Sequence, residues 1–199
     1  MDTEVMEMIQ KGEITQVQES QDQILSSIFL VPKKDMGYRP VINLKRLNSY
    51  IPYNHFKMES LALLKDLLQN KDYMVKLDLK DAYFSVPLHK ESQEKVRFMW
   101  KGRIYQFLCM CFGLGPAPRV FTKLLKIPIA LMRRLNVRLL IYLDDILILG
   151  SSKEENIQAR DTLIFLLQNL GFLINVKKSQ FQPTHNIQFF GVEIDSVKM

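Results

Sequence analysis

Two short acidic segments hold the residues best suited to chemistry. The first is the tetrapeptide YLDD at residues 142–145, which lies inside an apolar run over 137–150. Its adjacent carboxylates, Asp144 and Asp145, would repel each other at a hairpin tip, and a bound cation would remove that repulsion. Because aspartate is also a common turn residue, this pair taken alone leaves both a metal site and a plain turn open.

The second acidic segment favours the metal site. Asp78 lies at the end of an apolar run over 73–79 that reads as a strand, and a carboxylate there can meet a hairpin tip across a sheet. Asp78, Asp144 and Asp145 would supply oxygen ligands for two Mg²⁺ or Mn²⁺ ions about 3.5–4 Å apart. One ion would lower the pKa of an attacking hydroxyl, and the other would hold a triphosphate and stabilise the leaving oxygen. The pattern predicts phosphoryl or nucleotidyl transfer.

The elements that position these acids predict an α+β domain, with an antiparallel sheet backed by helices. Paired apolar runs around short polar turns indicate hairpins over 27–44, 98–107 and 137–150. Helical spacing and caps indicate helices over 59–69, from 117 to about 135 and from Ser152 to Gly171, and short strands follow over 172–176, 181–184 and 187–194.

Local signals mark the ends of two of these helices. Ser152 followed by Glu155 three residues later forms a capping-box pattern, and Gly171 is expected to end that helix. Pro118 suits the first turn of the preceding helix, and Pro128 is expected to kink it.

Composition narrows the class of protein. The 199 residues are 47% hydrophobic and 24% charged, which is enough to bury a core and excludes wholesale disorder. No apolar run approaches the roughly 18 residues of a membrane helix, and the acidic first residues show no secretory signal. Two cysteines, Cys109 and Cys111, make no disulfide framework and are expected to be inert packing thiols. We therefore expect an intracellular protein, cytoplasmic or nuclear, with no membrane partner.

The charge is distributed unevenly. Residues 1–22 hold six acids and one base, a net of −5, whereas residues 23–199 hold 26 bases and 15 acids, a net of +11. The first stretch reads as a short solvated helix and linker, an acidic arm that packs loosely on the body. The basic remainder allows nucleic acid, phosphate or an anionic membrane as a partner.

Three ordered motifs carry a family resemblance. The segments LDLKDAYFSVPL (77–88), CFGLGPAPRVF (111–121) and YLDD resemble motifs A, B and C of reverse transcriptases. The match is to retroelement enzymes of the retroviral, gypsy-like and DIRS-like kind, with the DIRS-like group nearest. That subgroup is suggested by IFLVPKK, YRPVINLKRLN and YLDDILILGSSKEE.

The resemblance implies the fingers and palm of a right-hand polymerase, without a thumb. We expect an arm over 1–23 and a catalytic domain over 24–195. Within that domain, the fingers would span about 24–72 and 85–115, and the palm about 73–84 and 116–195.

The resemblance also implies roles for the motif residues. Asp78, Asp144 and Asp145 match the catalytic, metal-binding carboxylates, and the Leu79 carbonyl matches a further metal ligand. Contacts to the incoming dNTP are implied for six residues: Lys33, Arg39, Asp81, Tyr83, Phe112 and Gly113. Tyr83 matches the aromatic gate that would clash with a ribose 2′-hydroxyl and so favour deoxynucleotides.

Two further roles are implied near the C-terminus, each with a plainer alternative. Lys178 matches a lysine that protonates the leaving pyrophosphate, although the match could shift to Lys177 or describe a solvated pair. Phe190 and Gly191 match the primer grip, although a buried strand would explain Phe190 as well. In the same way, Tyr83 could be a packed core residue, and Lys33 and Arg39 an exposed basic turn.

Basic side chains also flank the helix before YLDD. Arg133, Arg134 and Arg138 are expected either to contact a nucleic-acid backbone or simply to face solvent.

These implications favour an RNA-directed DNA polymerase, a nucleotidyltransferase that extends a primer on an RNA or DNA template with dNTPs and Mg²⁺ or Mn²⁺. One alternative is a non-catalytic nucleic-acid-binding relic or fragment of a retroelement polyprotein. Another is a palm-type RNA polymerase, which the aromatic Tyr83 disfavours. Oligomeric state and template preference are left open by the sequence.

Overall fold

The computed structural model describes residues 1–21, 23–32 and 37–198. The chain forms two compact units, one of residues 1–55 with 83–118, and the other of residues 56–82 with 119–199. Lys33, to which a dNTP contact is assigned by resemblance, lies outside the described residues.

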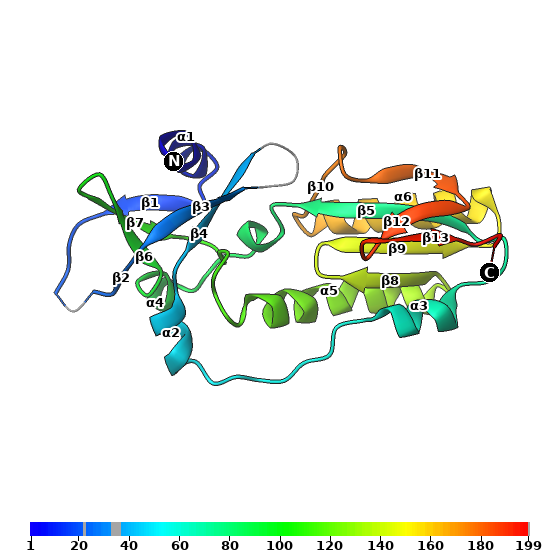
Figure 1. Ribbon diagram of the computed structural model, residues 1–199, viewed down its shortest axis with the longest axis horizontal. Coiled ribbons are helices and arrows are strands. Elements are labelled where there is room, and N and C mark those ends of the chain that lie inside the picture. The colour runs from blue at the N-terminus through cyan, green and yellow to red at the C-terminus, as the bar shows by residue number, and fades with distance from the viewer. Residues whose placement is uncertain (22, 33–36, 199) are drawn as a thin grey trace. The chain divides into compact units, whose positions relative to one another are not determined.

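The first unit is built on two small sheets (Figure 1). One has the order β1-β7-β6-β2, and the other is the hairpin β3-β4. The strands are β1 (Ile14–Val17), β2 (Leu25–Ser26), β3 (Ile28–Pro32), β4 (Tyr38–Ile42), β6 (Arg97–Trp100) and β7 (Arg103–Phe107). The helices are α1 (Asp2–Gln10), α2 (Lys45–Tyr50) and α4 (Lys90–Gln93), and the short 3₁₀ helix Ala82–Ser85 lies at the boundary between the units. Both expected hairpins of this unit are confirmed.

The N-terminal segment belongs to the core of the first unit. Val5 and Met8 of α1 are each 3% exposed, and Ile14 of β1 is 2% exposed. They pack in one apolar cluster with residues of β4, β6 and β7, and β1 pairs with β7. The expectation of a loosely packed arm is therefore wrong. The acidic residues do lie on the surface of α1. Val5 and Met8, three residues apart, form a buried apolar stripe on its other side.

The second unit is an antiparallel sheet with the order β10-β5-β9-β8, and β11 also pairs with β5. Its strands are β5 (Tyr73–Lys80), β8 (Arg138–Tyr142), β9 (Asp145–Gly150), β10 (Leu173–Ile174) and β11 (Gln180–Thr184), with a separate hairpin of β12 (Asn186–Phe189) and β13 (Val192–Asp195). The helices are α3 (Leu61–Leu67), α5 (Ala117–Arg134) and α6 (Lys153–Asn169). The expected α+β architecture is confirmed.

Both faces of this sheet are covered, which explains the nearly continuous apolar runs in β8 and β9. Met74 of β5 packs with Leu147 of β9, and with Ile187 and Phe189 of β12, in one buried cluster. Figure 1 shows α5 and α6 running alongside the strands, and α6 contacts both β5 and β9.

The helix signals in the sequence are largely borne out. The Ser152 hydroxyl accepts a hydrogen bond from the Glu155 amide at 3.1 Å, as expected of an N-cap. The Glu155 carboxylate reaches one residue further back than in a capping box, to the Ser151 amide at 2.8 Å. Helix α5 continues through Pro128 without ending.

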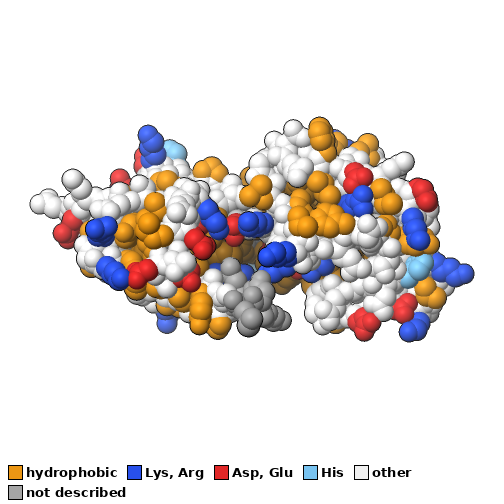
Figure 2. Space-filling view, turned by 90° about the horizontal axis from the view of Figure 1, so that it is seen from above, with side chains coloured by type: hydrophobic (Ala, Val, Ile, Leu, Met, Phe, Trp, Pro, Cys, Tyr) orange, Lys and Arg blue, Asp and Glu red, His pale blue; other side chains and the backbone are white. Residues whose placement is uncertain are grey.

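Charged side chains of both signs lie on the face shown in Figure 2. On the face that Figure 2 presents, Lys and Arg side chains are scattered over both units among acidic and apolar ones. No helix in the described part of the chain combines the length and apolar character needed to cross a bilayer.

Candidate active site

The YLDD segment forms the tight turn between β8 and β9. Tyr142 and Asp145 are paired across the hairpin, so the turn residues are Leu143 and Asp144, and Asp145 is the first residue of β9. The turn lies one residue earlier than an Asp-Asp turn would. Leu143 has a φ of 53°, a left-handed conformation that is disfavoured for any residue with a Cβ atom.

Strand register brings the third carboxylate to this hairpin. Asp78 of β5 lies directly opposite Asp145 of β9, and the Leu79 amide donates to the Asp144 carbonyl at 2.8 Å. The three predicted carboxylates therefore come from adjacent strands and gather at one end of the sheet. The sequence could suggest this meeting but not the register that produces it.

The backbone of Asp78 is held by a turn that sequence reasoning did not single out. The Asp78 amide donates to the Ser179 hydroxyl at 3.0 Å, and the Asn175 amide donates to the Asp78 carbonyl at 2.8 Å. Asn175 and Ser179 flank Lys178 in the segment NVKKSQF. Their polar side chains at the end of a short strand were the sequence signal that could have pointed to them.

The environment of Asp78 disfavours its ionised form. Burial and then the negative charges of Asp144 and Asp145 raise the pKa of Asp78 from 3.8 to about 6. A hydrogen bond from the Asn175 side chain and the positive charge of Lys178 act in the opposite direction. Lys178 is therefore near enough to Asp78 to act on its charge.

A divalent cation fits this donor set chemically. The side chains offer carboxylate oxygens, which Mg²⁺ and Mn²⁺ prefer, and a cation would offset both the burial and the neighbouring negative charges that raise the pKa of Asp78. Within the described residues, no three Asp, Glu, His or Cys side chains already form a metal-binding group. Asp145 is instead paired with a lysine, because its carboxylate lies 3.0 Å from the Lys76 ammonium.

The primer-grip candidates form a turn beside YLDD. Phe190 and Gly191 join β12 to β13, with φ values of 55° and 74°, as in a two-residue type I′ hairpin. The alternative of a buried strand is wrong for Phe190. Its ring packs on Tyr142 with centroids 4.7 Å apart. Both residues line a hollow of about 350 Å³ together with Asp145.

Four of the residues assigned to the dNTP belong to the first unit and gather there. The Arg39 guanidinium lies over the Phe112 ring, 4.3 Å from its centroid, and the Tyr83 ring is 5.1 Å from that of Phe112. Gly113 follows Phe112 directly. Asp81 belongs to the second unit, just past the end of β5, with a φ of 51°.

The motif B glycine is explained by close packing inside the first unit. Gly113 has a φ of 107°, and a Cβ atom there would lie 2.1 Å from the Ile42 carbonyl oxygen. The Asn48 side chain clamps the same loop, donating to the Gly113 carbonyl and accepting from the Gly115 amide, each at 2.8 Å. Asn48 has no predicted role in the site. The sequence signal that could have pointed to Asn48 is its position at the end of the motif segment YRPVINLKRLN.

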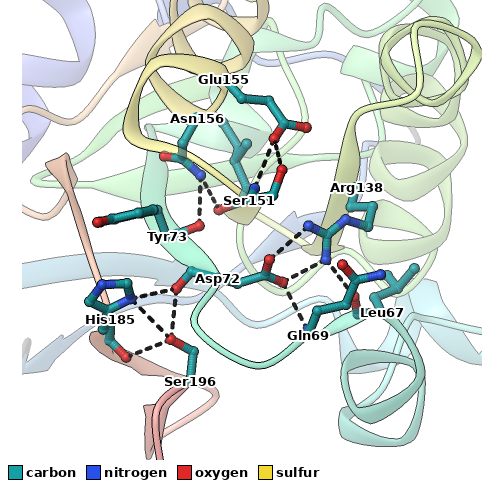
Figure 3. A network of polar contacts seen from close by, with 11 residues as sticks. Leu67, Gln69, Asp72, Tyr73, Arg138, Ser151, Glu155, Asn156, His185 and Ser196 are labelled. Carbon is teal, nitrogen blue, oxygen red and sulfur yellow. Dashed lines mark hydrogen bonds and ion pairs between the residues drawn. The ribbon is translucent and has the colours of Figure 1, made fainter.

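A buried polar network holds strands β5 and β8 at the ends away from the carboxylates. Asp72, 1% exposed, forms two hydrogen bonds with the Arg138 guanidinium. Its backbone carbonyl accepts from the Ser196 hydroxyl at 2.7 Å and lies 3.1 Å from His185 Nδ1 (Figure 3). Arg138 therefore has a structural role as the ion-pair partner of Asp72, which neither expected alternative included. This network anchors the first residues of β5 and β8, whose far ends carry the carboxylates.

A second contact secures the edge of the sheet. The Glu59 carboxylate accepts from the Ile141 amide at 2.8 Å and pairs with Arg133 at 2.6 Å. Arg133 is thus engaged in supporting β8, directly before the YLDD turn.

The two cysteines are buried, as expected. Burial raises the pKa values of Cys109 and Cys111 to about 12 each, so both remain thiols at neutral pH, which suits packing groups.

Comparison with known families decides the broader relationship. A family model described as reverse transcriptase (RNA-dependent DNA polymerase) matches residues 31–194. The chain belongs to the reverse transcriptase family. The Tf2-3 and Tf2-7 transposon polyproteins of Schizosaccharomyces pombe are each 28% identical over 167 residues. The match covers 84% of this chain but 12% of each polyprotein, so the chain spans a small part of these curated relatives. A retroelement origin is supported, and the DIRS-like subgroup stays a prediction.

Solved structures share the fold of this reverse transcriptase domain. A foamy viral protease–reverse transcriptase in complex with double-stranded DNA superposes with a TM-score of 0.86 at 22% identity, over 98% of this chain and 39% of that one. The foamy viral enzyme in complex with an RNA/DNA hybrid gives a TM-score of 0.83 at 22% identity, over 96% and 25%. The expected polymerase fold is confirmed, whereas the boundaries of fingers and palm stay predictions.

Proposed function

We propose that this chain is a catalytic RNA-directed DNA polymerase domain, which adds deoxynucleotides to a primer 3′-hydroxyl and releases pyrophosphate. One observation carries the proposal. Asp78, Asp144 and Asp145 converge at one end of the sheet of β5, β9 and β8, and burial, followed by the negative charges of Asp144 and Asp145, raises the pKa of Asp78 to about 6. Folding concentrates negative charge there, and a divalent cation would compensate it.

Mg²⁺ or Mn²⁺ would be held by the three carboxylates, with the Leu79 carbonyl as a further ligand. When bound, the ions would lower the pKa of the primer hydroxyl and neutralise charge on the leaving pyrophosphate. The chain's own contribution is to hold the carboxylates in place through β5, β8 and β9. Lys178, whose charge acts on Asp78, would donate a proton to the leaving pyrophosphate oxygen.

The first unit would bind the nucleotide. The Arg39 guanidinium can hold a phosphate through two parallel hydrogen bonds, and its position over Phe112 preorganises it. Tyr83, packed on the same ring, would exclude the ribose 2′-hydroxyl. Asp81, Gly113 and Lys33 complete the set assigned by resemblance.

Template and primer would be the nucleic-acid partners. Support comes from the foamy viral relatives, whose structures contain double-stranded DNA and an RNA/DNA hybrid. The Phe190–Gly191 turn would position the primer 3′ end, since it lies beside YLDD and lines the same hollow as Asp145.

Primer extension on an RNA template with Mg²⁺ or Mn²⁺ tests the proposal. Asp144→Asn should lower extension at least about 100-fold, because it removes a ligand charge but little volume. Asp66→Asn, an exposed change on α3, is the matched control and should extend normally. Both variants should bind template–primer as the wild type does.

Two results would contradict the assignment. Full extension by Asp144→Asn would remove that carboxylate from the mechanism. A folded wild-type chain that binds template–primer but extends it with neither metal would instead support the non-catalytic binding alternative.

A further inference from the structure

Lys76 is a basic residue inside the palm sheet to which no role is assigned above. It lies on β5, two residues before Asp78, and is paired with Leu147 of β9 and Gln180 of β11. Because side chains alternate along a strand, Lys76 shares one face with Asp78. It therefore lies between the carboxylates and the apolar cluster around Met74.

The Lys76 ammonium lies beside the third carboxylate, within ion-pair distance. Its Nζ lies 3.0 Å from Asp145 Oδ1, and the two side chains are 20% and 31% exposed. The same nitrogen is 5.9 Å from the centroid of the buried Phe189 ring. A partly desolvated pair of this kind is worth more than an exposed one.

Strand geometry explains why a cation is useful at this position. Asp78 and Asp145 are directly opposed across β5 and β9, and like charges at opposed positions destabilise a sheet. A residue two positions along the strand is a diagonal neighbour, within reach of a long side chain. Lys76 occupies that diagonal, so its charge offsets the repulsion that the register creates.

Two lysines among the described residues act on these carboxylates. Lys178 acts on Asp78 from the turn after β10, whereas Lys76 pairs with Asp145 from within β5. Lys178 already has a proposed part in the reaction. Lys76 touches a metal-ligand candidate and has none.

We propose that Lys76 is a positioning residue that neutralises Asp145 in the metal-free palm, so that a divalent cation must compete with its ammonium. This inference rests on the proposed function, since it takes Asp145 as a metal ligand. A cation can bind while Lys76 stays in place, and is then repelled by it, or it can displace the ammonium and lose the pair. In both cases the lysine lowers metal affinity while stabilising the metal-free sheet.

Direct titration with Mn²⁺ alone tests this on the full chain, without nucleic acid or nucleotide. Electron paramagnetic resonance of free Mn²⁺ measures the affinity. Lys76→Met should lower the dissociation constant by roughly five- to tenfold, because it removes a positive charge a few ångströms from the site. Lys76→Arg keeps the charge and should stay within about twofold of the wild type. Lys65→Met, the same loss of charge at an exposed position on α3, is the control and should leave the constant unchanged.

Thermal unfolding gives an independent readout. In EDTA, Lys76→Met should unfold at a lower temperature than the wild type, because Asp78 and Asp145 then face each other uncompensated. Saturating Mn²⁺ should raise its midpoint by more than it raises that of the wild type, since tighter binding stabilises more. Lys76→Gln, a second neutral variant with a polar end, should behave in the same way.

Several results would overturn the proposal. These are an unchanged or weaker Mn²⁺ affinity in folded Lys76→Met, a Lys76→Arg variant that binds like Lys76→Met, or neutral variants that fold neither in EDTA nor with Mn²⁺. The last result would assign Lys76 to packing. A wild-type chain that fails to extend primers contradicts the proposed function instead. The Mn²⁺ titration can still be interpreted in that case, because it measures metal binding and not primer extension.

Discussion

Replacing Asp78 with asparagine should make the metal-free protein more stable while abolishing its activity. The residue is 8% exposed, and its carboxylate faces Asp144 and Asp145. Burial and these charges raise its pKa from 3.8 to about 6. Folding therefore disfavours the ionised carboxylate, and Asp78→Asn removes that penalty together with a proposed metal ligand.

The size and pH range of the effect follow from the two pKa values. A rise from 3.8 to about 6 corresponds to about 3 kcal/mol at most, because each pKa unit is about 1.4 kcal/mol. We expect about 1–2 kcal/mol after allowing for solvent screening at the open end of the sheet. The group binds a proton more tightly in the folded state, so its contribution is full below pH 3.8 and is lost as the pH rises through about 6. The advantage of Asp78→Asn should therefore be absent near pH 4 and complete above pH 6 to 7.

Urea unfolding in EDTA, followed by circular dichroism at pH 4.5 and pH 8, measures this difference. The free energy of unfolding of Asp78→Asn should exceed that of the wild type by about 1–2 kcal/mol at pH 8, and the gap should shrink at pH 4.5. Asp66→Asn, on the exposed side of α3, should show no such pH-dependent gap. Primer extension by Asp78→Asn should be lost, as expected where a strained site trades stability for function.

An Asp78→Asn variant that is less stable than the wild type at pH 8 would refute this reasoning. The carboxylate would then be net stabilising in the metal-free fold, and the repulsion among the three acids could not be what raises its pKa. A gain of equal size at both pH values would also refute it, because the gain would then not come from ionisation.

Four further substitutions have expected outcomes. Gly113→Ala should destabilise the protein by at least about 2 kcal/mol in urea unfolding, because its Cβ would lie 2.1 Å from the Ile42 carbonyl oxygen at a φ of 107°. Arg138→Met should cost about 3 kcal/mol, since it leaves the Asp72 carboxylate buried without its ion pair. Asp72→Asn should lower the free energy of unfolding by only about 1 kcal/mol, because the partner left without its ion pair is then Arg138, which is more exposed than Asp72. Equal losses in the two variants would contradict this. Tyr83→Ala should admit ribonucleotides in single-nucleotide incorporation assays, and unchanged discrimination would remove Tyr83 from the gate.

Much of the local structure could be predicted from short-range patterns. The YLDD hairpin, the strand that leads to Asp78 and the cap at Ser152 follow from short apolar runs and turn chemistry, which involve residues close in the chain. The motif residues could be named for the same reason, since their identity and spacing are local properties. The α1 segment shows the limit, because its acidic composition hid the two apolar residues that bury it in the core.

The remaining features depend on pairings between distant residues. Asp78 meets Asp145 only because β5 and β9 adopt one register, and a slip by one residue would turn one carboxylate to the opposite face. The buried pair of Asp72 and Arg138 spans 66 positions, and neither residue signals the other in the sequence.

The sequence by itself determined which chemistry is available: three carboxylates, a basic hairpin and an aromatic residue, Tyr83, in the order of a reverse transcriptase. Only the tertiary structure decided how those charges balance. It set Asp145 opposite Asp78, placed Lys76 diagonally across from Asp145, and raised the pKa of Asp78. The physical reason is that residue identity is encoded locally, whereas electrostatic energy depends on distances that arise only when remote strands pair.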